Sequence, residues 1–233
     1  MKKVVLVDGN NLLFRSYYAT AYTGNIMRNS KGFPTNGLYG FVNMLNKILN
    51  EEQPLYILVA FDIGKTFRHN KYDDYKGGRS ETPDDLKMQF PVAKEILVSM
   101  GIKYLEVVGY EADDIIGTYA KMIDDSDDYT GLIVSSDKDL LQLISDKVTV
   151  KLLKSKDYIM MDHDTFVDTY GIEPIRMIDL KGLMGDASDN IPGVKGIGEK
   201  TALKLLKSYD TIENLYEHID EVKGAVHNKL VDG

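Results

Sequence analysis

The chain has 233 residues, of which 43% are hydrophobic and 27% are charged, a balance typical of a folded globular protein. It contains no cysteine, which excludes disulfide bonds, cysteine zinc sites, iron–sulfur clusters and thiol catalysis. No apolar run is long enough to span a bilayer, and the apolar run near the start is too short for a signal peptide. We therefore expect a cytoplasmic protein, a monomer with no membrane partner.

The net charge of −8 is concentrated in one segment. Residues 106–139 contain ten acidic residues and two lysines, whereas the rest of the chain contains 26 acidic and 26 basic residues. Four of the ten fit a solvated helix face and lack the glycine and final glutamate of a calcium-binding loop: Asp124, Asp125, Asp127 and Asp128. The other carboxylates lie among apolar residues, where an unpaired charge is costly, and they therefore need a cation.

Short apolar runs predict β-strands at residues 3–7, 55–61, 132–135 and 148–153. Helical patterns lie between these runs, at 36–50, 84–100 and 112–122. This alternation predicts an α/β body with a mainly parallel sheet that is covered on both faces. From about residue 165 onward only helices are expected, at 174–184, 199–207 and 212–218. We therefore divide the chain into an α/β body, residues 1–165, and a helical module, residues 166–233.

Acidic residues lie where the predicted strands end. Asp8 and Asp62 end the first two strands, and Asp137 follows the third. One such aspartate is commonly a helix N-cap, but three at the same edge of a parallel sheet are hard to explain as caps. The neighbouring segments add further acids, namely Glu111, Asp113, Asp114 and Asp139. Converging carboxylates repel one another unless cations neutralise them, and oxygen ligands suit the pair of Mg²⁺ ions used in phosphodiester hydrolysis.

A glycine-rich stretch follows the body. Asp186 and Asp189 lie just before it, three residues apart, and would share a face if helical. Residues 193–201 resemble a P-loop only superficially, because Glu199 stands where a lysine should follow glycine and no strand precedes it. A glycine turn that opens a helix presents N–H groups to an anion, here a DNA phosphate, and Lys195 and Lys200 add charge. The alternative is a turn that only joins two helices.

The segment 65–79 combines five basic residues with two acidic ones. Phe67, Tyr72 and Tyr75 are interleaved with the bases, and this combination is typical of surfaces that bind single-stranded nucleic acid. The alternative is a solvated amphipathic helix. Because the segment begins just after Asp62, we favour a role at the rim of the metal site.

Together these motifs resemble the bacterial 5′-nuclease (flap endonuclease) family, the type found at the N-terminus of DNA polymerase I and as stand-alone proteins. The resemblance extends nearly end to end and rests on Val7-Asp8-Gly9 with Phe14-Arg15-Ser16-Tyr17, Phe61-Asp62 with Lys65-Thr66-Phe67-Arg68, Tyr75-Lys76 with Arg79, Glu111-Ala112-Asp113-Asp114, Asp137-Lys138-Asp139, Gly185-Asp186 with Asp189-Asn190-Ile191-Pro192-Gly193, and Gly196 with Gly198-Glu199-Lys200-Thr201-Ala202.

The resemblance implies a PIN-like α/β/α body, a helical arch near residues 64–85 and a helix–three-turn–helix (SAM-like) DNA-binding module. It implies 5′-3′ exonuclease and 5′-flap endonuclease activity with two Mg²⁺ ions, for which Mn²⁺ can substitute, in replication and repair. A K⁺ ion is a further expectation at the 193–198 turn. The expected partners are DNA with 5′ flaps, nicks or 5′ ends, and a fused or separate DNA polymerase. Family domains normally continue for several more helices, so the module is expected to be truncated.

The resemblance also assigns site residues. It implies nine metal ligands: Asp8, Asp62, Glu111, Asp113, Asp114, Asp137, Asp139, Asp186 and Asp189. We assign Asp8, Asp62, Glu111 and Asp113 to one ion and the others to the second. The expected catalytic residues are Lys76 and Arg79, which neutralise the scissile phosphate, and Tyr17, which stacks on a base unless it is a core residue. The expected DNA contacts are Arg15, Arg68, Tyr75, Lys195, Gly196, Gly198, Lys200 and Thr201.

Three other classes of protein share some of these features. A PIN-type ribonuclease would have the strand-end acids but usually neither the arch nor the 193–202 module. A non-catalytic DNA-binding protein would have the module but no use for nine converging acids. A phosphatase of small molecules would need the acids but not the basic and aromatic segment.

Overall fold

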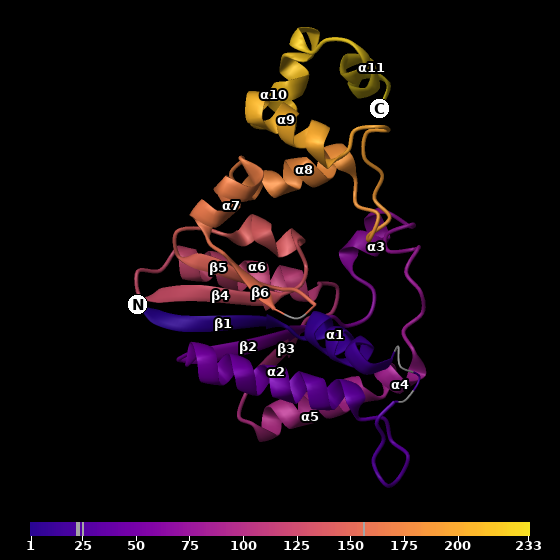
Figure 1. The fold of residues 1–233 in the computed structure, drawn as a ribbon, viewed down its shortest axis with the longest axis vertical. Helices are drawn as coiled ribbons and strands as arrows, with labels where there is room; N and C mark the ends of the chain where they lie inside the picture. Colours follow the sequence, from indigo (N-terminus) through magenta and orange to yellow (C-terminus); the bar gives the residue numbers. More distant parts are fainter. Residues whose placement is uncertain (22–23, 25, 156) are drawn as a thin grey trace.

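The computed structural model describes residues 1–21, 24, 26–155 and 157–233. A six-stranded sheet in the order β3-β2-β1-β4-β5-β6 forms the body (Figure 1). The pairs from β3 to β5 are parallel, and β6 at the edge is antiparallel to β5. The strands are β1 Lys2–Asp8, β2 Tyr56–Phe61, β3 Lys103–Glu106, β4 Tyr129–Ser135, β5 Val148–Leu153 and β6 Tyr158–Met161.

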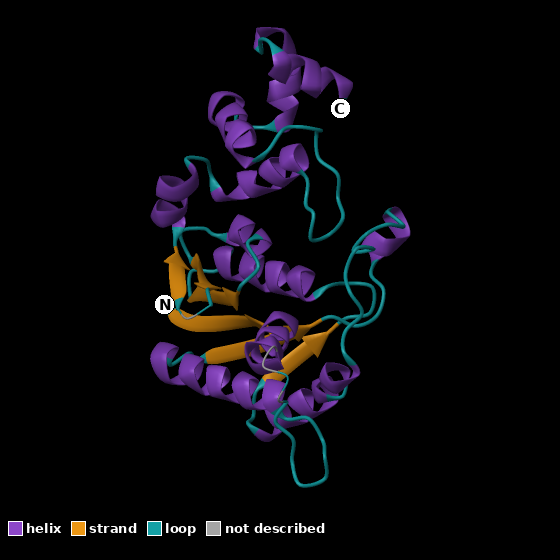
Figure 2. Ribbon diagram, turned by 45° about the vertical axis from the view of Figure 1, so that its right-hand side comes forward, coloured by secondary structure: helices purple, strands orange, loops and turns teal. Residues whose placement is uncertain are grey.

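Helices cover both faces of the sheet, so the central strands are apolar along nearly their whole length (Figure 2). On one face, Val5 and Val7 of β1 pack with residues of α1, α2 and α5. On the other face, Leu6 packs with residues of α6 and of the 3₁₀ helix η1. The bounds of these elements are α1 Gly9–Ala21, α2 Asn36–Glu52, α5 Gln89–Ser99, α6 Ala112–Asp124 and η1 Asp139–Leu143.

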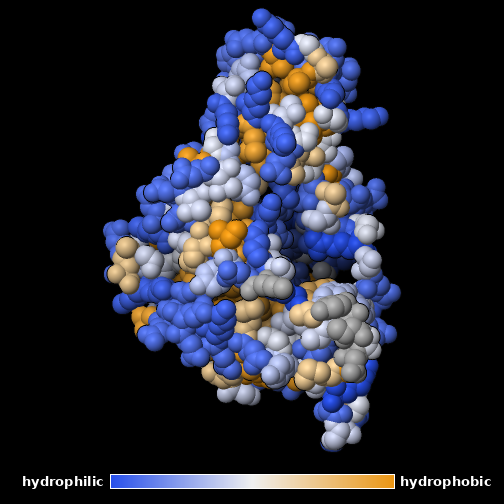
Figure 3. All heavy atoms as spheres, viewed as in Figure 1, coloured by the Kyte–Doolittle hydropathy of each residue, from blue (hydrophilic) through white to orange (hydrophobic). Residues whose placement is uncertain are grey.

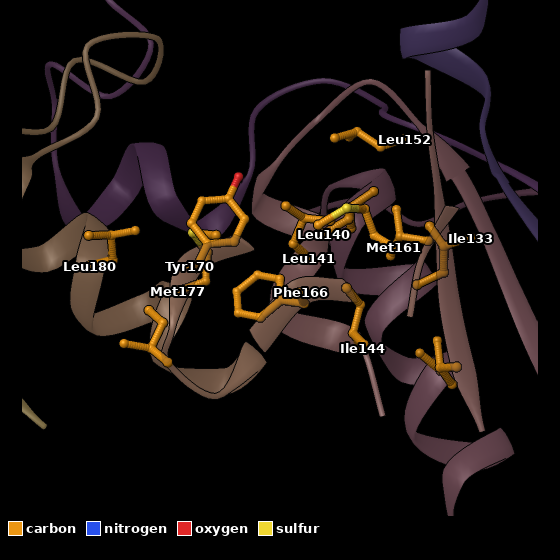
Figure 4. Packing of buried hydrophobic residues seen from close by; sticks show 14 of the residues in the cluster. Ile133, Leu140, Leu141, Ile144, Leu152, Met161, Phe166, Tyr170, Met177 and Leu180 are labelled. Carbon is orange, nitrogen blue, oxygen red and sulfur yellow. The ribbon is translucent and has the colours of Figure 1, made fainter. Parts of the chain in front are cut away.

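A helical module follows the sheet and shares the core of its second face. Phe166 is fully buried and, with Tyr170, belongs to the same apolar cluster as Ile133 of β4 and Met177 of the module (Figure 4). The body and the module are therefore held by one continuous core. The module comprises α7 His163–Tyr170, η2 Pro174–Arg176, α8 Met177–Met184, α9 Glu199–Tyr209, α10 Ile212–Glu217, η3 Ile219–Glu221 and α11 Ala225–Asp232.

The arch, residues 64–85, joins β2 to α4 Asp84–Lys87 and contains the short helix α3 Phe67–Lys71. Beyond α3, the arch reaches the loop between α8 and α9. The Lys76 backbone N–H donates to Asp189 O at 2.9 Å, and Asn190 Nδ2 donates to Asp74 O at 2.9 Å. Lys76 has a left-handed backbone (φ 58°), which is uncommon for a residue with a side chain. The arch is thus tied to the module, and beyond α3 it is built mostly of turns.

The α/β body and its parallel sheet are confirmed, and all four predicted strands are present. The sequence pattern missed β3, β6, α7 and α11, and it began the third predicted strand three residues too late. The helix predicted at 84–100 is two helices that meet at Met88. Residue 165 lies within α7, and the division at that residue stays a prediction. Within the described residues, no helix has the length and apolar character needed to cross a membrane.

Candidate active site

A first group of acids gathers at the carboxyl ends of β1, β2 and β4. Asp8 and Asp62 line a cavity of about 270 Å³ together with Glu111, Asp113 and Asp137. Figure 3 shows hydrophilic side chains around a hollow between the body and the arch. The topology explains this convergence, because parallel neighbours deliver their last residues to one edge of the sheet.

Hydrogen bonds fix the two strand-end carboxylates of this group. Asp8 accepts from the Asn11 backbone N–H at 2.9 Å and from Ser135 Oγ at 3.0 Å. Asp62 accepts from the Ala112 N–H at 2.6 Å and from Asn10 Nδ2 at 3.1 Å. Asp8 therefore does bond the first turn of α1 as a cap would, but this bond leaves it facing the cavity. Asp8 is therefore both an N-cap of α1 and a member of the first acid group.

The electrostatics of the first group show a deficit of positive charge. Burial raises the pKa of Asp8 to about 7, and the charges of Asp62 and Asp137 add to the shift. Burial likewise raises the pKa of Asp113 well above its usual value, with contributions from Asp8, Asp137, Asp62 and Glu111. Carboxyl groups in this state are poised to release protons when a cation arrives.

A second group of acids lies beside a cavity of about 590 Å³. Asp139, Asp186 and Asp189 each offer a carboxylate oxygen within 4.8 Å of the others. Asp186 and Asp189 lie on a hairpin that Asp186 and Ile191 close with two backbone hydrogen bonds, both 2.8 Å. They share a tight loop and not the helix face considered from their spacing.

The second group contains a lysine that the sequence pattern did not single out. Lys181 Nζ lies 2.7 Å from Asp139 Oδ1 and 2.7 Å from Asp186 Oδ2. Burial raises the pKa of Asp186, but Lys181 and Ser188 outweigh it, so the pKa lies well below the usual value. Burial raises the pKa of Asp139, against the effect of Lys181.

Two of the nine acids are placed differently from our assignment to the ions. Asp137 lines the smaller cavity with the first group, although its charge also acts on Asp139. Asp114 forms a two-point ion pair with Arg68, at 2.7 and 2.8 Å, and accepts from the Glu111 N–H at 2.8 Å. Burial raises the pKa of Asp114, but the Arg68 guanidinium lowers it more. Asp114 thus holds the arch and completes the capping box of α6, and it lines the larger cavity as the partner of Arg68.

The arch brings its cations to the acids. Lys76 Nζ donates to Glu111 Oε1 at 2.9 Å, and Arg79 Nη2 donates to Asp189 Oδ1 at 2.5 Å. The Tyr75 hydroxyl, which has one proton to donate, lies 3.1 Å from a Glu111 carboxylate oxygen and 3.0 Å from an Asp189 carboxylate oxygen. Lys76 and Arg79 both line the smaller cavity, as a role beside the scissile phosphate requires. Tyr75, expected at the DNA, is 6% exposed and links the two acid groups instead.

Two residues of α1 lie away from the acids. Tyr17 is 4% exposed and packs edge-on against Tyr18 within the core of the first sheet face, which favours the core interpretation over stacking on a base. The Arg15 guanidinium donates to Lys154 O and lines a separate small cavity beside Tyr158. A DNA contact by Arg15 stays a prediction.

The glycine turn before α9 is exposed and anchored by one apolar side chain. Lys195, Gly196, Gly198 and Lys200 are exposed, whereas Ile197 is buried in the core of the module. An added Cβ at Gly198 would meet nothing within 4 Å, so the surface there is open. Thr201 lies in the first turn of α9, and its N–H bonds Gly198 O at 3.0 Å. Lys229 of α11 donates to Gly196 O at 2.9 Å.

The polar residues that support the acids were missed by the sequence pattern. Ser135 and Asn10 hold first-group acids, and Ser188 donates twice to Asp186 Oδ1, at 2.8 and 2.6 Å. The pairs Asn10-Asn11 and Ser135-Ser136, each next to a strand-end aspartate, were the available signal. Lys181 gave no such signal, because its spacing from Asp186 places it in a different element.

The donor set fits hard divalent cations. Among the described residues, Asp139 Oδ1 is a buried oxygen without a hydrogen bond, although the Lys181 ammonium lies beside it. All of the candidate ligand atoms are carboxylate oxygens, which Mg²⁺ and Mn²⁺ prefer over softer ligands. Burial raises the pKa of Asp8, and the neighbouring carboxylates of Asp62 and Asp137 raise it further.

Two family models match the chain in succession. They are described as "5'-3' exonuclease, N-terminal resolvase-like domain", over residues 3–171, and "5'-3' exonuclease, C-terminal SAM fold", over residues 172–233. The chain belongs to the 5′-3′ exonuclease family. The family resemblance seen in the motifs is therefore confirmed, and so is the SAM-like nature of the module.

Curated relatives of two lengths belong to this exonuclease family. DNA polymerase I of Bacillus caldotenax is 48% identical over 226 residues, which are 96% of this chain and 25% of that protein. The 5′-3′ exonuclease of Bacillus subtilis (strain 168) is 44% identical over 234 residues, 99% of this chain and 78% of the relative. The chain thus spans about a quarter of the polymerase relatives that it matches.

Solved structures share the exonuclease fold at lower identity. The T5 5′-exonuclease with bound divalent zinc has a TM-score of 0.73 and 24% identity, and the match covers 98% of this chain and 84% of that chain. The catalytic core of Rad2 in complex with DNA substrate has a TM-score of 0.64 and 18% identity, with coverage of 99% and 73%. These matches confirm the arrangement of the α/β body and the helical module.

Proposed function

We propose that this chain hydrolyses DNA phosphodiesters as a 5′-3′ exonuclease and 5′-flap endonuclease that depends on two Mg²⁺ ions. The observation that carries the proposal is the convergence of two acid groups beneath a basic arch. Apart from Asp114, eight of the described carboxylates line the two adjoining cavities: Asp8, Asp62, Glu111, Asp113, Asp137, Asp139, Asp186 and Asp189. The relatives named as exonucleases support the same activity.

The first group would hold one ion and the second group the other. Bound divalent ions lower the pKa of an attacking water and neutralise the leaving oxygen in phosphodiester hydrolysis. Asp8 and Asp62 fix the first position, because hydrogen bonds from Ser135 and Ala112 hold them in place. Asp139 and Asp186 fix the second.

The arch cations would act on the phosphate itself. Lys76 and Arg79 line the cavity of the first group and would neutralise charge that develops on the scissile phosphate. Each of them starts paired with an acid, Glu111 or Asp189, and exchanges that carboxylate for the phosphate. Cleavage on this scheme leaves a 5′-phosphate and a 3′-hydroxyl.

The module would grip the duplex by its backbone. Lys195 and Lys200 flank an exposed turn whose N–H groups can approach phosphates without sequence preference. We also propose action as a cytoplasmic monomer, a K⁺ ion at the 193–198 turn and a DNA polymerase partner, which the polymerase relatives support.

The test is cleavage of a labelled 5′-flap duplex with and without Mg²⁺, beside an RNA hairpin and a phosphate monoester. We expect cleavage of the flap duplex in Mg²⁺ or Mn²⁺ alone, with little turnover of the other substrates. Preferred cleavage of the RNA hairpin would favour a ribonuclease, and flap binding without cleavage would favour a non-catalytic DNA-binding protein.

The Asp139→Asn variant tests the second ion. We expect cleavage to fall by about 10²-fold or more, because this substitution removes one of the charges that hold the ion. Flap binding, measured in Ca²⁺ by fluorescence anisotropy, should stay at or above the wild-type level. Wild-type turnover of this variant at saturating Mg²⁺ would contradict the assignment.

A further inference from the structure

Lys181 lies in the middle of the second acid group. It extends from α8, and its ammonium group is 2.7 Å from both Asp139 Oδ1 and Asp186 Oδ2. The side chain is 27% exposed, so solvent reaches one side of it. A single ammonium group therefore bridges two carboxylates that come from separate elements.

The oxygens that Lys181 contacts are those that a metal ion would need. Asp186 Oδ1 already accepts two hydrogen bonds from Ser188, at 2.8 and 2.6 Å, so Oδ2 is the oxygen left for a cation. Asp139 Oδ1 is buried, and Lys181 is the group that the described residues place against it. The ammonium group thus stands where an ion held by these carboxylates would stand.

We infer that Lys181 is a built-in counter-ion of the second acid group, which a divalent cation must displace before Asp139 and Asp186 can hold it. This inference rests on the proposed function and adds a competitor for the second ion. The flexible four-carbon stem and the exposed side allow the ammonium group to leave toward solvent without moving α8. In the absence of metal, Lys181 keeps the carboxylates together and lessens their repulsion.

A purely structural ion pair is the alternative. In that case Lys181 would fasten α8 to η1 and to the hairpin, and its removal would destabilise the protein without changing its affinity for metal. Competition makes the opposite prediction for metal affinity, because loss of the ammonium group vacates the two oxygens and makes the local potential more negative. The affinity for metal therefore separates the two interpretations.

The experiment is calorimetric titration of the protein with Mn²⁺ in the absence of DNA. In Lys181→Met, which keeps the length of the side chain, we expect the weaker Mn²⁺ site to tighten by about tenfold or more, about 1.4 kcal/mol. Lys181→Arg retains the positive charge and should bind Mn²⁺ as the wild type does. Lys181→Gln provides a second neutral variant, and circular dichroism melting in EDTA verifies that each variant folds.

Lys151→Met is the matched control. Lys151 also bridges two carboxylates, Glu51 at 2.7 Å and Glu52 at 2.8 Å, but it lies outside both acid groups. Its loss should lower the melting temperature and leave Mn²⁺ affinity unchanged. A general effect of removing a buried lysine would appear in this variant too.

Unchanged or weaker Mn²⁺ binding in both neutral variants would overturn the inference, since Lys181 would then be a structural pair or an aid to metal binding. That result would leave the proposed function standing if the wild type binds two Mn²⁺ ions. If neither the wild type nor the neutral variants bind Mn²⁺ at Asp139 and Asp186, as judged against Asp139→Asn, the inference and the two-ion proposal both fail.

Discussion

Individual carboxylates in this protein differ sharply in their surroundings, and these differences assign them different tasks. Asp114 is neutralised by Arg68 and serves the architecture. Asp8 is buried with only uncharged donors and therefore retains an unmet need for a cation. The sequence shows both residues as acids within family motifs. Only their contacts in the structure show that Asp114 holds the arch and that Asp8 is a candidate metal ligand.

Asp8 should make the metal-free protein less stable as the pH rises. Its pKa of about 7 in the fold exceeds its ordinary value of 3.8, so between these values the folded chain holds a proton that the unfolded chain has lost. Stability in EDTA should therefore fall from about pH 4 to about pH 7 and then level off. Asp8→Asn should flatten that slope, as measured by the melting temperature across this range. A melting temperature that rises with pH in EDTA would contradict this prediction.

Lys76 and Arg68 should have different effects on chemistry and capture. Lys76→Ala should slow single-turnover cleavage in Mg²⁺ by about 10²-fold or more, with little effect on the dissociation constant in Ca²⁺, because its charge is needed mainly in the transition state. Arg68→Ala breaks the pair with Asp114 and should weaken capture of the 5′ strand more than it slows cleavage. Equal losses of affinity and rate in Lys76→Ala would mean that Lys76 only helps to bind DNA and has no catalytic role.

At the scale of elements, the hairpin between α8 and α9 controls where two acids stand. Gly185 and Gly193 pack backbone against backbone at its base, and an added Cβ on Gly193 would lie 2.1 Å from Gly185 N. Neither helical periodicity nor charge pattern reveals such a contact. The motif that contains both glycines could be read from the sequence, but the reason for the glycines could not.

Gly193→Ala should disrupt the hairpin and displace Asp186 and Asp189. We expect a lower melting temperature and loss of most Mg²⁺-dependent cleavage, because the added methyl group meets backbone atoms that cannot rotate away. Gly198→Ala is the matched control, since its Cβ would meet nothing within 4 Å and should leave the melting temperature unchanged. A fully active, stable Gly193→Ala would show that the hairpin tolerates the shift.

Gly198→Val should instead weaken binding to duplex DNA. The larger side chain fits the fold but blocks close approach of the turn to a phosphate, so affinity should fall about equally for unrelated sequences. Lys200→Ala should reduce the salt dependence of binding by about one phosphate contact. Anisotropy titrations with two unrelated duplexes at several salt concentrations would measure both effects. A loss confined to one sequence would indicate base readout.

At the scale of the whole molecule, apolar periodicity was enough to predict the four central strands of the sheet and the helices α2 and α6, but not the edge strands β3 and β6. The parallel order brings Asp8 and Asp62 to one edge, so convergence of the first acid group was also predictable. The pairing of Asp139 with Asp186 was not, because it depends on how α8 packs against η1. β6 was missed because it has only four residues, and its two middle residues are exposed.

The continuous core predicts that the body and the module unfold together. Phe166 is fully buried between them, so Phe166→Ala should lower the free energy of unfolding by about 3–5 kcal/mol. Calorimetry should show a single transition that moves to lower temperature. Two separated transitions, in the wild type or in the variant, would mean that the module folds on its own.

Because of the internal ion pairs of the site, the binding of monovalent salt, of divalent metal and of DNA should depend on one another. Lys76, Arg79 and Lys181 each begin bonded to a carboxylate of the chain itself, so each phosphate that recruits one of the arch cations leaves a carboxylate without its partner. That carboxylate takes up a cation from solution and offsets about one of the counterions that DNA releases. Without divalent ions, affinity should therefore depend less steeply on monovalent salt than the number of bases in the arch suggests. With divalent ions, the vacated carboxylates bind them, so metal and DNA each raise the affinity for the other by the same factor.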